Sequence, residues 1–350
     1  MSIKNLKKLV EINSHSFNPK GLKACATFLM SLFDPLGAKK TQKKGVIFYE
    51  MRKKAPIQIV LGGHYDTVHA ETSSFQKLKA RGSEKIIGPG AADMKGGLLV
   101  LLEALKKFEA SPFKDQIGWR LYLNPDEEIG SPNSGSLIQA FCKGALAAFI
   151  FEPALSDGSL VSSRKGSMNI LIRSIGKSAH AGRDLEHGKN ALAPLAHLIK
   201  AIDGTKGLNI AAMNGGSSFN TVPDEGILKL NYRSDHAKDF NAFEKRLKSL
   251  VKKYGLQMEI VSERPPKPFD KKTEKLFKAL RYPVKLKASG GVTDGNLIAA
   301  LGIPTIDTLG VIGGKLHTDE EYFEKASFKD RSELFYQFLI RLAKKEVTLC

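Results

Sequence analysis

The segment IGWRLYLNPDEEIG, residues 117–130, joins an apolar run to three consecutive carboxylates. In the run, Trp119, Leu121 and Leu123 alternate with their neighbours as the residues of a half-buried strand do, and Pro125 ends the strand. Three like charges at the end of a strand repel one another unless a cation, a proton or a hydrogen-bond donor lies among them. On its own, such a triplet is typical of a solvated acidic turn, because charge runs usually face water.

The composition is that of a globular chain of enzyme size. Its 350 residues are 42% hydrophobic and 26% charged, which is enough to bury one large core or two ordinary cores. Most of the 54 Lys and Arg residues are Lys, and they are spread along the whole sequence, which carries a net charge of +18. Recognition of nucleic acid favours clustered Arg or a basic stripe, so we expect no nucleic-acid partner.

The cysteines and the hydropathy indicate the compartment. Cys25, Cys142 and Cys350 share no metal-binding spacing and cannot all pair, which is typical of thiols in a reducing compartment. The first residues have helical spacing rather than the apolar region of a signal peptide, and no apolar run approaches the roughly 20 residues of a membrane helix. We therefore expect a soluble cytoplasmic protein without a membrane partner.

Helical and strand patterns alternate in the first part of the chain. Helical spacing covers 3–13, 20–33, 98–108 and 136–141, and strand-like runs cover 46–49, 57–61, 117–123 and 146–151. This order predicts an α/β domain with a mainly parallel sheet and helices on both faces. Open sheets of this kind bind their ligands at the carboxyl ends of the strands.

Acids and one histidine stand at or just beyond those strand ends. They are His64, with Asp66 two residues later, Asp93 in a glycine-rich turn, the pair Glu127 and Glu128, and Glu152. A histidine beside a carboxylate is also common without metal, and an aspartate before a helix is also a natural N-cap. Together, however, so many carboxylates in one crevice require cations, and a mixed set of His, Asp and Glu suits zinc or a similar divalent ion.

The pattern of predicted strands and helices changes after Glu152. Residues 168–173 and 226–233 alternate as strands do, and 190–202 and 240–254 have helical spacing, which predicts two helices on a small antiparallel sheet. We place this inserted α+β domain at residues 166–281, between a first part at 1–165 and a second part at 282–350. In the second part, 284–287 and 304–308 are strand-like, and a final helix spans 327–344.

Seven segments, in this order along the chain, resemble those of one enzyme family. They are HYDTV at His64, GPGAADMKGG at Asp93, NPDEEIGS at Glu127, FEPA at Glu152, SAHAG at His180, SGGVTDGN at Asp294 and HTDEEY at His317. Together they resemble the co-catalytic zinc aminoacylase and carboxypeptidase family of metallopeptidases, which includes glutamate carboxypeptidase, succinyl-diaminopimelate desuccinylase, acetylornithine deacetylase and the aminoacylases. The resemblance covers nearly the whole chain, and SGGVTDGN is closest to the glutamate carboxypeptidase branch.

The resemblance implies a centre with two divalent metal ions, which would be Zn²⁺ in the first place, with Co²⁺ or Mn²⁺ as alternatives. Asp93 would bridge the two ions, His64 and Glu152 would complete one site, and Glu128 and His317 would complete the other. The chemistry agrees with this division, because two ions about 3.5–4 Å apart need a shared carboxylate.

The resemblance also implies three catalytic residues. Asp66 would orient the histidine ligand, and Glu127 would be the general base for a metal-bound hydroxide that attacks an amide carbonyl. His180 matches a histidine that polarises the carbonyl oxygen from the partner subunit, so the insertion would be a dimerisation and lid domain of a homodimer. From the residues alone, His180 is equally compatible with a loop position without a role.

Four further residues match positions that line the family's substrate cleft. They are Asn220 and Arg233 in the insertion, and Gly291 and Thr293 in SGGVTDGN. Arginine suits a substrate carboxylate because its planar fork binds both oxygens.

The expected function is hydrolysis of an amide bond in a small peptide or N-acyl amino acid, with release of a C-terminal amino acid such as glutamate. Two alternatives remain open: an N-acyl amino acid deacylase of the deacetylase or desuccinylase type, and a non-catalytic relative that holds an anionic partner. The sequence also departs from the family at His69 and Ala70, where many relatives carry an aromatic residue and a proline.

Overall fold

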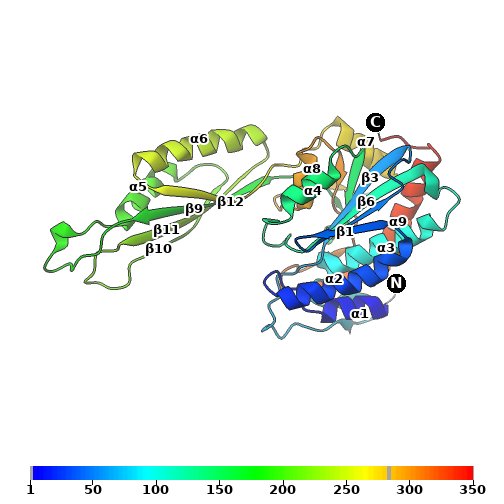
Figure 1. Cartoon of the computed structure of the whole chain (residues 1–350), viewed down its shortest axis with the longest axis horizontal. Coiled ribbons are helices and arrows are strands. Elements are labelled where there is room, and N and C mark those ends of the chain that lie inside the picture. Colours follow the sequence, from blue (N-terminus) through cyan, green and yellow to red (C-terminus); the bar gives the residue numbers. More distant parts are fainter. Residues whose placement is uncertain (1–2, 282–284, 350) are drawn as a thin grey trace. The chain divides into compact units, whose positions relative to one another are not determined.

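The computed structural model describes residues 3–281 and 285–349, and the chain divides into two compact units. The first comprises the residues up to Arg164 and those from Lys267 onwards, and the second comprises Lys165–Pro266. Figure 1 shows the elements of both units. The predicted boundary at Tyr282, the predicted strand residue Val284 and Cys350 lie outside the described residues.

A six-stranded sheet forms the centre of the first unit. Its strands follow the order β1 (Lys39–Lys43), β2 (Val46–Met51), β6 (Ile117–Asn124), β3 (Ile57–His64), β7 (Ala147–Ile150) and β14 (Thr305–Ile306). The last four run parallel to one another, whereas β2 pairs antiparallel with both β1 and β6. The sheet is therefore mainly parallel, as the alternation of helix and strand patterns predicted.

Two hydrophobic cores lie on opposite faces of this sheet, because successive residues of a strand point to opposite faces. In β6, Leu121 belongs to the larger core and Tyr122 to the smaller one. Helices of the larger core are α1 (Ile3–Glu11), α2 (Pro19–Phe33), α3 (Gly97–Glu109), α7 (Lys271–Leu280) and α9 (Lys325–Ala343). The smaller core is covered by α4 (Gly135–Cys142) and α8 (Asp294–Ala299), so helices on both faces are confirmed (Figure 1).

Shorter elements complete the first unit. Strands β8 (Leu160–Arg164) and β13 (Leu286–Ser289) form a parallel pair, and short helical turns are η1 (Asp34–Leu36), η2 (Ala91–Gly96) and η3 (Lys114–Gln116). A second sheet has the order β15 (Gly313–Gly314), β16 (Tyr322–Glu324), β5 (Lys85–Ile87) and β4 (Lys79–Arg81). This second sheet brings the segment before Asp93 beside the segment after His317.

The second unit is an antiparallel sheet with helices and a core of its own. Its strands follow the order β10 (Leu208–Gly215), β11 (Glu225–Ser234), β9 (Gly166–Ile175) and β12 (Gln257–Arg264), and its helices are η4 (Leu185–His187), α5 (Leu192–Ile202) and α6 (Ala237–Lys253). The sequence indicated β9, β11 and both long helices. It missed β10 and β12, because few side chains of these strands are buried and their apolar pattern is weak.

The second unit ends at Pro266, which corrects the predicted boundary at Arg281. The helix α7 belongs to the first unit, since its residues Leu276, Phe277 and Leu280 lie in the larger core. A helical pattern shows which face of a helix is apolar but does not show which core that face enters.

The chain leaves and re-enters the first unit at adjacent points. Arg164 and Lys267 pair through two backbone hydrogen bonds, of 2.9 Å from the Arg164 N–H and 3.0 Å from the Lys267 N–H. Their side chains converge on buried Asp307, with Arg164 Nε 2.7 Å from Oδ2 and Lys267 Nζ 3.6 Å from Oδ1. The buried carboxylate of Asp307 thus contacts both Arg164, where the chain leaves the first unit, and Lys267, where it returns.

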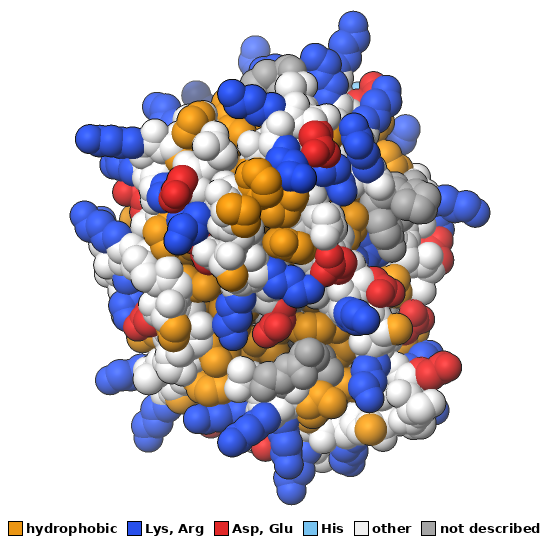
Figure 2. All heavy atoms as spheres, turned by 90° about the vertical axis from the view of Figure 1, so that its right-hand side faces the viewer, with side chains coloured by type: hydrophobic (Ala, Val, Ile, Leu, Met, Phe, Trp, Pro, Cys, Tyr) orange, Lys and Arg blue, Asp and Glu red, His pale blue; other side chains and the backbone are white. Residues whose placement is uncertain are grey.

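Basic side chains stand at many separate points on the face of the molecule shown in Figure 2, with acidic side chains between them. This distribution agrees with the scattered lysines of the sequence. Among the helices that the structure describes, none is both long and apolar enough to cross a bilayer.

Candidate metal centre

Three neighbouring parallel strands deliver most of the predicted site residues. Strand β3 lies between β6 and β7, with Gly62 opposite both Tyr122 and Ile150. Because parallel strands end at the same edge of a sheet, His64 at the end of β3 lies near the residues that follow β6 and β7. Those residues include the acidic turn, defined as residues 125–128, and Glu152.

His64 is buried and contacts carboxylates through both ring nitrogens. Its Nε2 atom lies 3.0 Å from Asp93 Oδ1 and 3.7 Å from Glu152 Oε2. On the other side of the ring, Nδ1 lies 3.2 Å from Asp66 Oδ1. The ring is therefore held in one orientation, with Nε2 facing Asp93 and Glu152.

Asp93 lies between two groups of potential ligands. Its Oδ1 atom faces His64, and its Oδ2 atom lies 3.3 Å from His317 Nε2. The same nitrogen of His317 lies 3.2 Å from Glu128 Oε2. Ligand atoms of His64, Asp93 and Glu128 all lie within 4.8 Å of one another. Glu152 joins this group through His64, and His317 joins it through Asp93 and Glu128.

The glycines around Asp93 allow its turn to pass close to other backbone. Gly90 has φ +67°, and a Cβ atom at Gly97 would lie only 1.9 Å from the carbonyl oxygen of Phe151. The start of α3 is thereby held against the end of β7, which precedes Glu152. Asp93 itself has non-helical backbone angles, and the residue before α3 is Gly96, so Asp93 is not the N-cap of that helix.

Asp66 has a second role that the sequence did not indicate. Its Oδ1 atom accepts a hydrogen bond of 3.1 Å from the Glu127 N–H, and its Oδ2 atom accepts one of 3.1 Å from the Glu128 N–H. The hydroxyl of Ser16 donates to Oδ2 at 2.8 Å. One buried carboxylate therefore fixes both the His64 ring and the acidic turn.

The electrostatics of the cluster are dominated by burial of like charges. Burial raises the pKa of Glu152 to about 8 and, together with the charge of Asp93, raises that of Glu128 to about 7. Contacts with Asp93 and Glu128 raise the pKa of His317 to about 11. Burial opposes protonation of His64, but the surrounding carboxylates hold its pKa well above the ordinary value.

These shifts describe a cluster that binds positive charge. At neutral pH, protons on the two histidines compensate part of the negative charge of the carboxylates. Divalent cations take the place of protons at such a donor set, and the mixture of imidazole and carboxylate suits zinc better than magnesium or calcium. The residues present therefore fit the metal pair that the resemblance implies.

The predicted substrate residues of the first unit have structural contacts. Thr293 caps α8, since its hydroxyl accepts from the Gly295 N–H at 3.1 Å, and that hydroxyl also donates to Asp307 Oδ2 at 3.1 Å. The carbonyl of Gly291 accepts from Arg164 at 3.3 Å.

Asp294, the residue after Thr293, connects this segment with the strand that leads into the acidic turn. Its carboxylate accepts from Asn124 Nδ2 at 2.6 Å and from Ser131 Oγ at 2.7 Å. The motif SGGVTDGN marks the position of Asp294 in the sequence but does not indicate this contact.

The second unit holds the other three predicted residues. His180 and Thr221 form a β-bridge, and the Ala181 N–H donates to the Asn220 carbonyl at 2.9 Å, so the His180 and Asn220 segments lie side by side. Both residues are exposed. Arg233, in β11, is partly buried, and its Nε donates to Asn231 Oδ1 at 2.9 Å.

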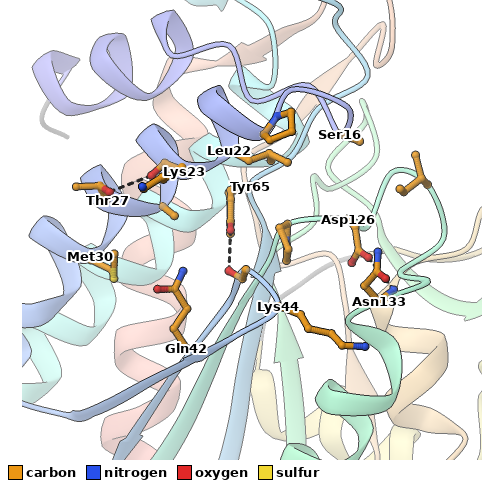
Figure 3. Close-up of a pocket in the computed structure, with 15 residues that line it drawn as sticks. Ser16, Leu22, Lys23, Thr27, Met30, Gln42, Lys44, Tyr65, Asp126 and Asn133 are labelled. Atoms are coloured by element: carbon orange, nitrogen blue, oxygen red, sulfur yellow. Dashed lines mark hydrogen bonds between the residues drawn. The ribbon is translucent and has the colours of Figure 1, made fainter.

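Figure 3 shows a pocket of about 710 Å³ that is lined in part by Pro125 and Asp126 of the acidic turn. The same turn carries the predicted ligand Glu128. The pocket is bounded by one face of α2, by the β1–β2 hairpin and by residues 125–133, including Asp126. The Tyr65 hydroxyl reaches across to the Gly45 carbonyl at 2.8 Å. None of the five predicted ligands is among the described residues that line this pocket.

Comparison with known proteins gives relatives over nearly the full chain. Carboxypeptidase G2 of Pseudomonas sp. (strain RS-16) is 29% identical over 357 residues, which cover 94% of this chain and 86% of that protein. A succinyl-diaminopimelate desuccinylase of Ruthia magnifica subsp. Calyptogena magnifica is 24% identical, with 97% of this chain and 98% of that protein covered.

Solved structures share the fold. A tripeptidase from Staphylococcus aureus superposes with a TM-score of 0.76 at 22% identity, covering 98% of each chain. An M20 family metallo-carboxypeptidase from Sulfolobus solfataricus superposes with a TM-score of 0.74 at 18% identity, covering 96% of this chain and 98% of that one.

The model of peptidase family M20/M25/M40 matches residues 60–341, which include all five predicted ligands. This match confirms the resemblance inferred from the seven segments. The chain belongs to peptidase family M20/M25/M40 and is a hydrolase of the peptidase and amidohydrolase type.

Proposed function

We propose that this chain is a two-metal amide hydrolase that releases a C-terminal amino acid from a small peptide or N-acyl conjugate. The observation that carries the proposal is the position of Asp93, whose two carboxylate oxygens face two separate histidines at 3.0 Å and 3.3 Å. A carboxylate in that position is what a pair of divalent ions requires as a shared ligand.

The proposed ligand sets follow the distances. His64 and Glu152 would hold one ion and His317 and Glu128 the other, with Asp93 as the ligand that both would share. Bound Zn²⁺ ions would act as Lewis acids for the scissile carbonyl and would make a water molecule more acidic.

Glu127 is the proposed general base. It is buried, it directly precedes a proposed ligand, and its N–H is held by Asp66 at 3.1 Å. In the proposed reaction Glu127 takes a proton from the attacking water as the new C–O bond forms. It then gives that proton to the leaving amine as the C–N bond breaks.

The second unit is the proposed source of substrate contacts and of the dimer interface. His180 polarises the scissile carbonyl in the partner subunit's site, with Asn220 beside it, and Arg233 binds the free α-carboxylate of the amino acid that is released. The exposure of His180 supports this assignment, since a residue that serves another subunit must be accessible on its own. Mixing inactive His180→Ala chains with inactive Glu127→Gln chains should restore activity in the mixed dimers, and well-exchanged mixtures that stay inactive would exclude action between subunits.

A C-terminal amino acid as the leaving group is supported by the 29% identity with carboxypeptidase G2. The 24% identity with succinyl-diaminopimelate desuccinylases supports the second candidate, deacylation of an N-acyl amino acid. Both substrate classes present a free carboxylate beside the scissile amide. Matched substrates with a free and an amidated C-terminus test this common feature: the wild type should strongly prefer the free acid, and Arg233→Ala should lose that preference. A wild type indifferent to amidation would remove the role of Arg233.

The central experiment combines metal content with turnover. The purified protein is assayed on dipeptides and N-acyl amino acids before and after chelation, and its zinc content per chain is measured. Glu127→Gln should retain both ions while kcat falls by at least ~100-fold, the scale of lost general-base catalysis. A chain that binds no metal, or a Glu127→Gln variant with near-normal turnover, would contradict the proposed mechanism. A metal-free, inactive chain would favour the non-catalytic alternative.

A further inference from the structure

A buried carboxylate with no assigned role lies next to the Asp93 turn. Glu321 is 1% exposed, four residues after His317 in the chain. Its Oε1 atom accepts hydrogen bonds from the N–H groups of Ala92 at 2.8 Å and Asp93 at 3.0 Å. Its Oε2 atom accepts from the Gly90 N–H at 3.1 Å and lies 3.2 Å from His69 Nε2.

This arrangement is an anion site that the chain fills with its own side chain. Backbone N–H groups that converge in a turn form a concavity for a negative group. Here three such groups come from Gly90, Ala92 and Asp93, and the Glu321 carboxylate is the anion. The Asp93 side chain points to the two histidines, while the Asp93 N–H is bound to Glu321.

The backbone of Glu321 also connects the turn that carries His317 with the turn that carries Asp93. Its carbonyl accepts from the Gly88 N–H at 3.2 Å, and its own N–H donates to the Thr318 carbonyl at 3.1 Å. Directly after it, Tyr322 of β16 pairs with Ile87 of β5. The turn that carries His317 is therefore attached to the turn that carries Asp93 through both main chain and side chain.

We propose that Glu321 is a positioning residue that sets where Asp93 lies relative to His317, and so fixes the spacing of the two metal positions. The proposal rests on the proposed function for the presence of the two ions, but the anchoring contacts themselves are made by protein groups alone. His69 takes part as a fourth partner of the carboxylate, which gives a purpose to a residue that departs from the family pattern.

Replacement of Glu321 by glutamine removes the negative charge and keeps the shape of the side chain. Glu321→Gln keeps the volume, but its NH₂ group must face N–H donors, either those of Ala92 and Asp93 or that of Gly90. At least one hydrogen bond is lost in either orientation. The matched control is Glu320→Gln, because Glu320 is adjacent and 55% exposed, and its carboxylate pairs with the surface cations Lys315 at 2.5 Å and Arg81 at 3.8 Å. His69→Phe is a milder variant that removes one partner of Oε2 and leaves the carboxylate in place.

The first measurement needs no metal. In the chelated protein, amide hydrogen exchange of residues 90–93 should accelerate in Glu321→Gln, should accelerate less in His69→Phe, and should stay at the wild-type rate in Glu320→Gln. Unchanged exchange in Glu321→Gln would overturn the proposal, whether or not the wild type binds metal. If the wild type takes up no ions while the exchange difference persists, the proposed function fails and the anchoring stands.

The second measurement is metal binding, by calorimetric titration with Zn²⁺ and by the magnetic coupling between two bound Co²⁺ ions. Loss of a group that orients a metal ligand costs roughly 10- to 100-fold in affinity, so Glu321→Gln should weaken binding on this scale and alter the Co²⁺ coupling. A merely structural role would lower the melting temperature and leave both affinities and the coupling as in Glu320→Gln. That result would also overturn the proposal.

Discussion

The two halves of the candidate metal centre differ in how they are built. His64 is 1% exposed, stands at the end of a central strand and is fixed by Asp66 from behind. His317 is 54% exposed and stands on a turn, in the left-handed backbone region at φ +64°. The buried half takes its geometry from the register of three strands, whereas the exposed half depends on how one turn is attached to another.

This difference means that the two halves of the centre should not bind their ions equally well. The unshared ligands of the buried half, His64 and Glu152, are in place as soon as the sheet forms. The exposed half is complete only when the His317 turn is docked on the Asp93 turn. We therefore expect the half containing His317 to lose its ion first when a chelator is added in increasing amounts.

Removing Asp93 should have the largest effect on metal binding and activity, because both halves of the centre depend on this residue. In Asp93→Ala both halves lose their shared oxygen ligand, so we expect less than one tightly bound ion per chain and activity below detection. Added zinc should raise the melting temperature of the wild type by mass action and leave that of the variant unchanged. Unchanged zinc stoichiometry in Asp93→Ala would show that Asp93 does not bridge the ions.

Substituting each histidine separately should sharpen the comparison in the chelated protein. His64→Ala leaves buried carboxylates without their partner, which costs about 3–5 kcal/mol in the free energy of unfolding. His317→Ala should cost at most about 1 kcal/mol, because that ring is half exposed and solvent screens its ion pairs. Urea unfolding of both variants at pH 6 provides the measurement, and equal losses would mean that burial does not distinguish the two halves.

The free energy of unfolding and the zinc affinity should both change gradually with pH. The pKa values of Glu128 and Glu152 are raised to about 7 and about 8, so near neutral pH the metal-free folded chain holds protons that the unfolded chain has released. These carboxyls therefore lower the free energy of unfolding as pH rises from about 5 to 8. A metal ion must displace the same protons, so zinc affinity should rise over this range, by up to about tenfold per pH unit for each proton displaced. Titration calorimetry in buffers of different ionisation enthalpy counts these protons, and an affinity that is flat or falls with pH would contradict the shifts.

The sequence could predict the main fold because its signals are local. Alternating apolar residues in Trp119, Leu121 and Leu123 mark a strand, and an acid directly after a strand lies at a sheet edge whatever the rest of the chain does. The segments at His64 and Glu152 repeat this logic. The parallel sheet, the two helical layers and the proximity of His64, Asp93, Glu128 and Glu152 follow from such patterns, whereas His317 was expected as a ligand only from the family resemblance.

Other features depend on contacts between distant residues and were not predictable in the same way. The second role of Asp66 requires the acidic turn to lie 3.1 Å away, and Thr293 acts as a helix cap only because α8 begins after it. Residues 271–280 were included in the insertion without a predicted element, and the structure shows that they form α7 and pack into the larger core. Glu321 was hidden within an acidic run beside His317, where composition alone indicates a solvated surface.

The adjacent crossing points at Arg164 and Lys267 have a consequence for modularity. Since these two residues already pair through backbone hydrogen bonds, a short reverse turn in place of residues 165–266 would close the chain of the first unit without moving either end. The shortened chain would keep Glu127 and all five ligands and would lack His180, Asn220 and Arg233. The proposed metal ligands and the substrate residues proposed for the insertion thus lie in parts of the gene that a single excision separates.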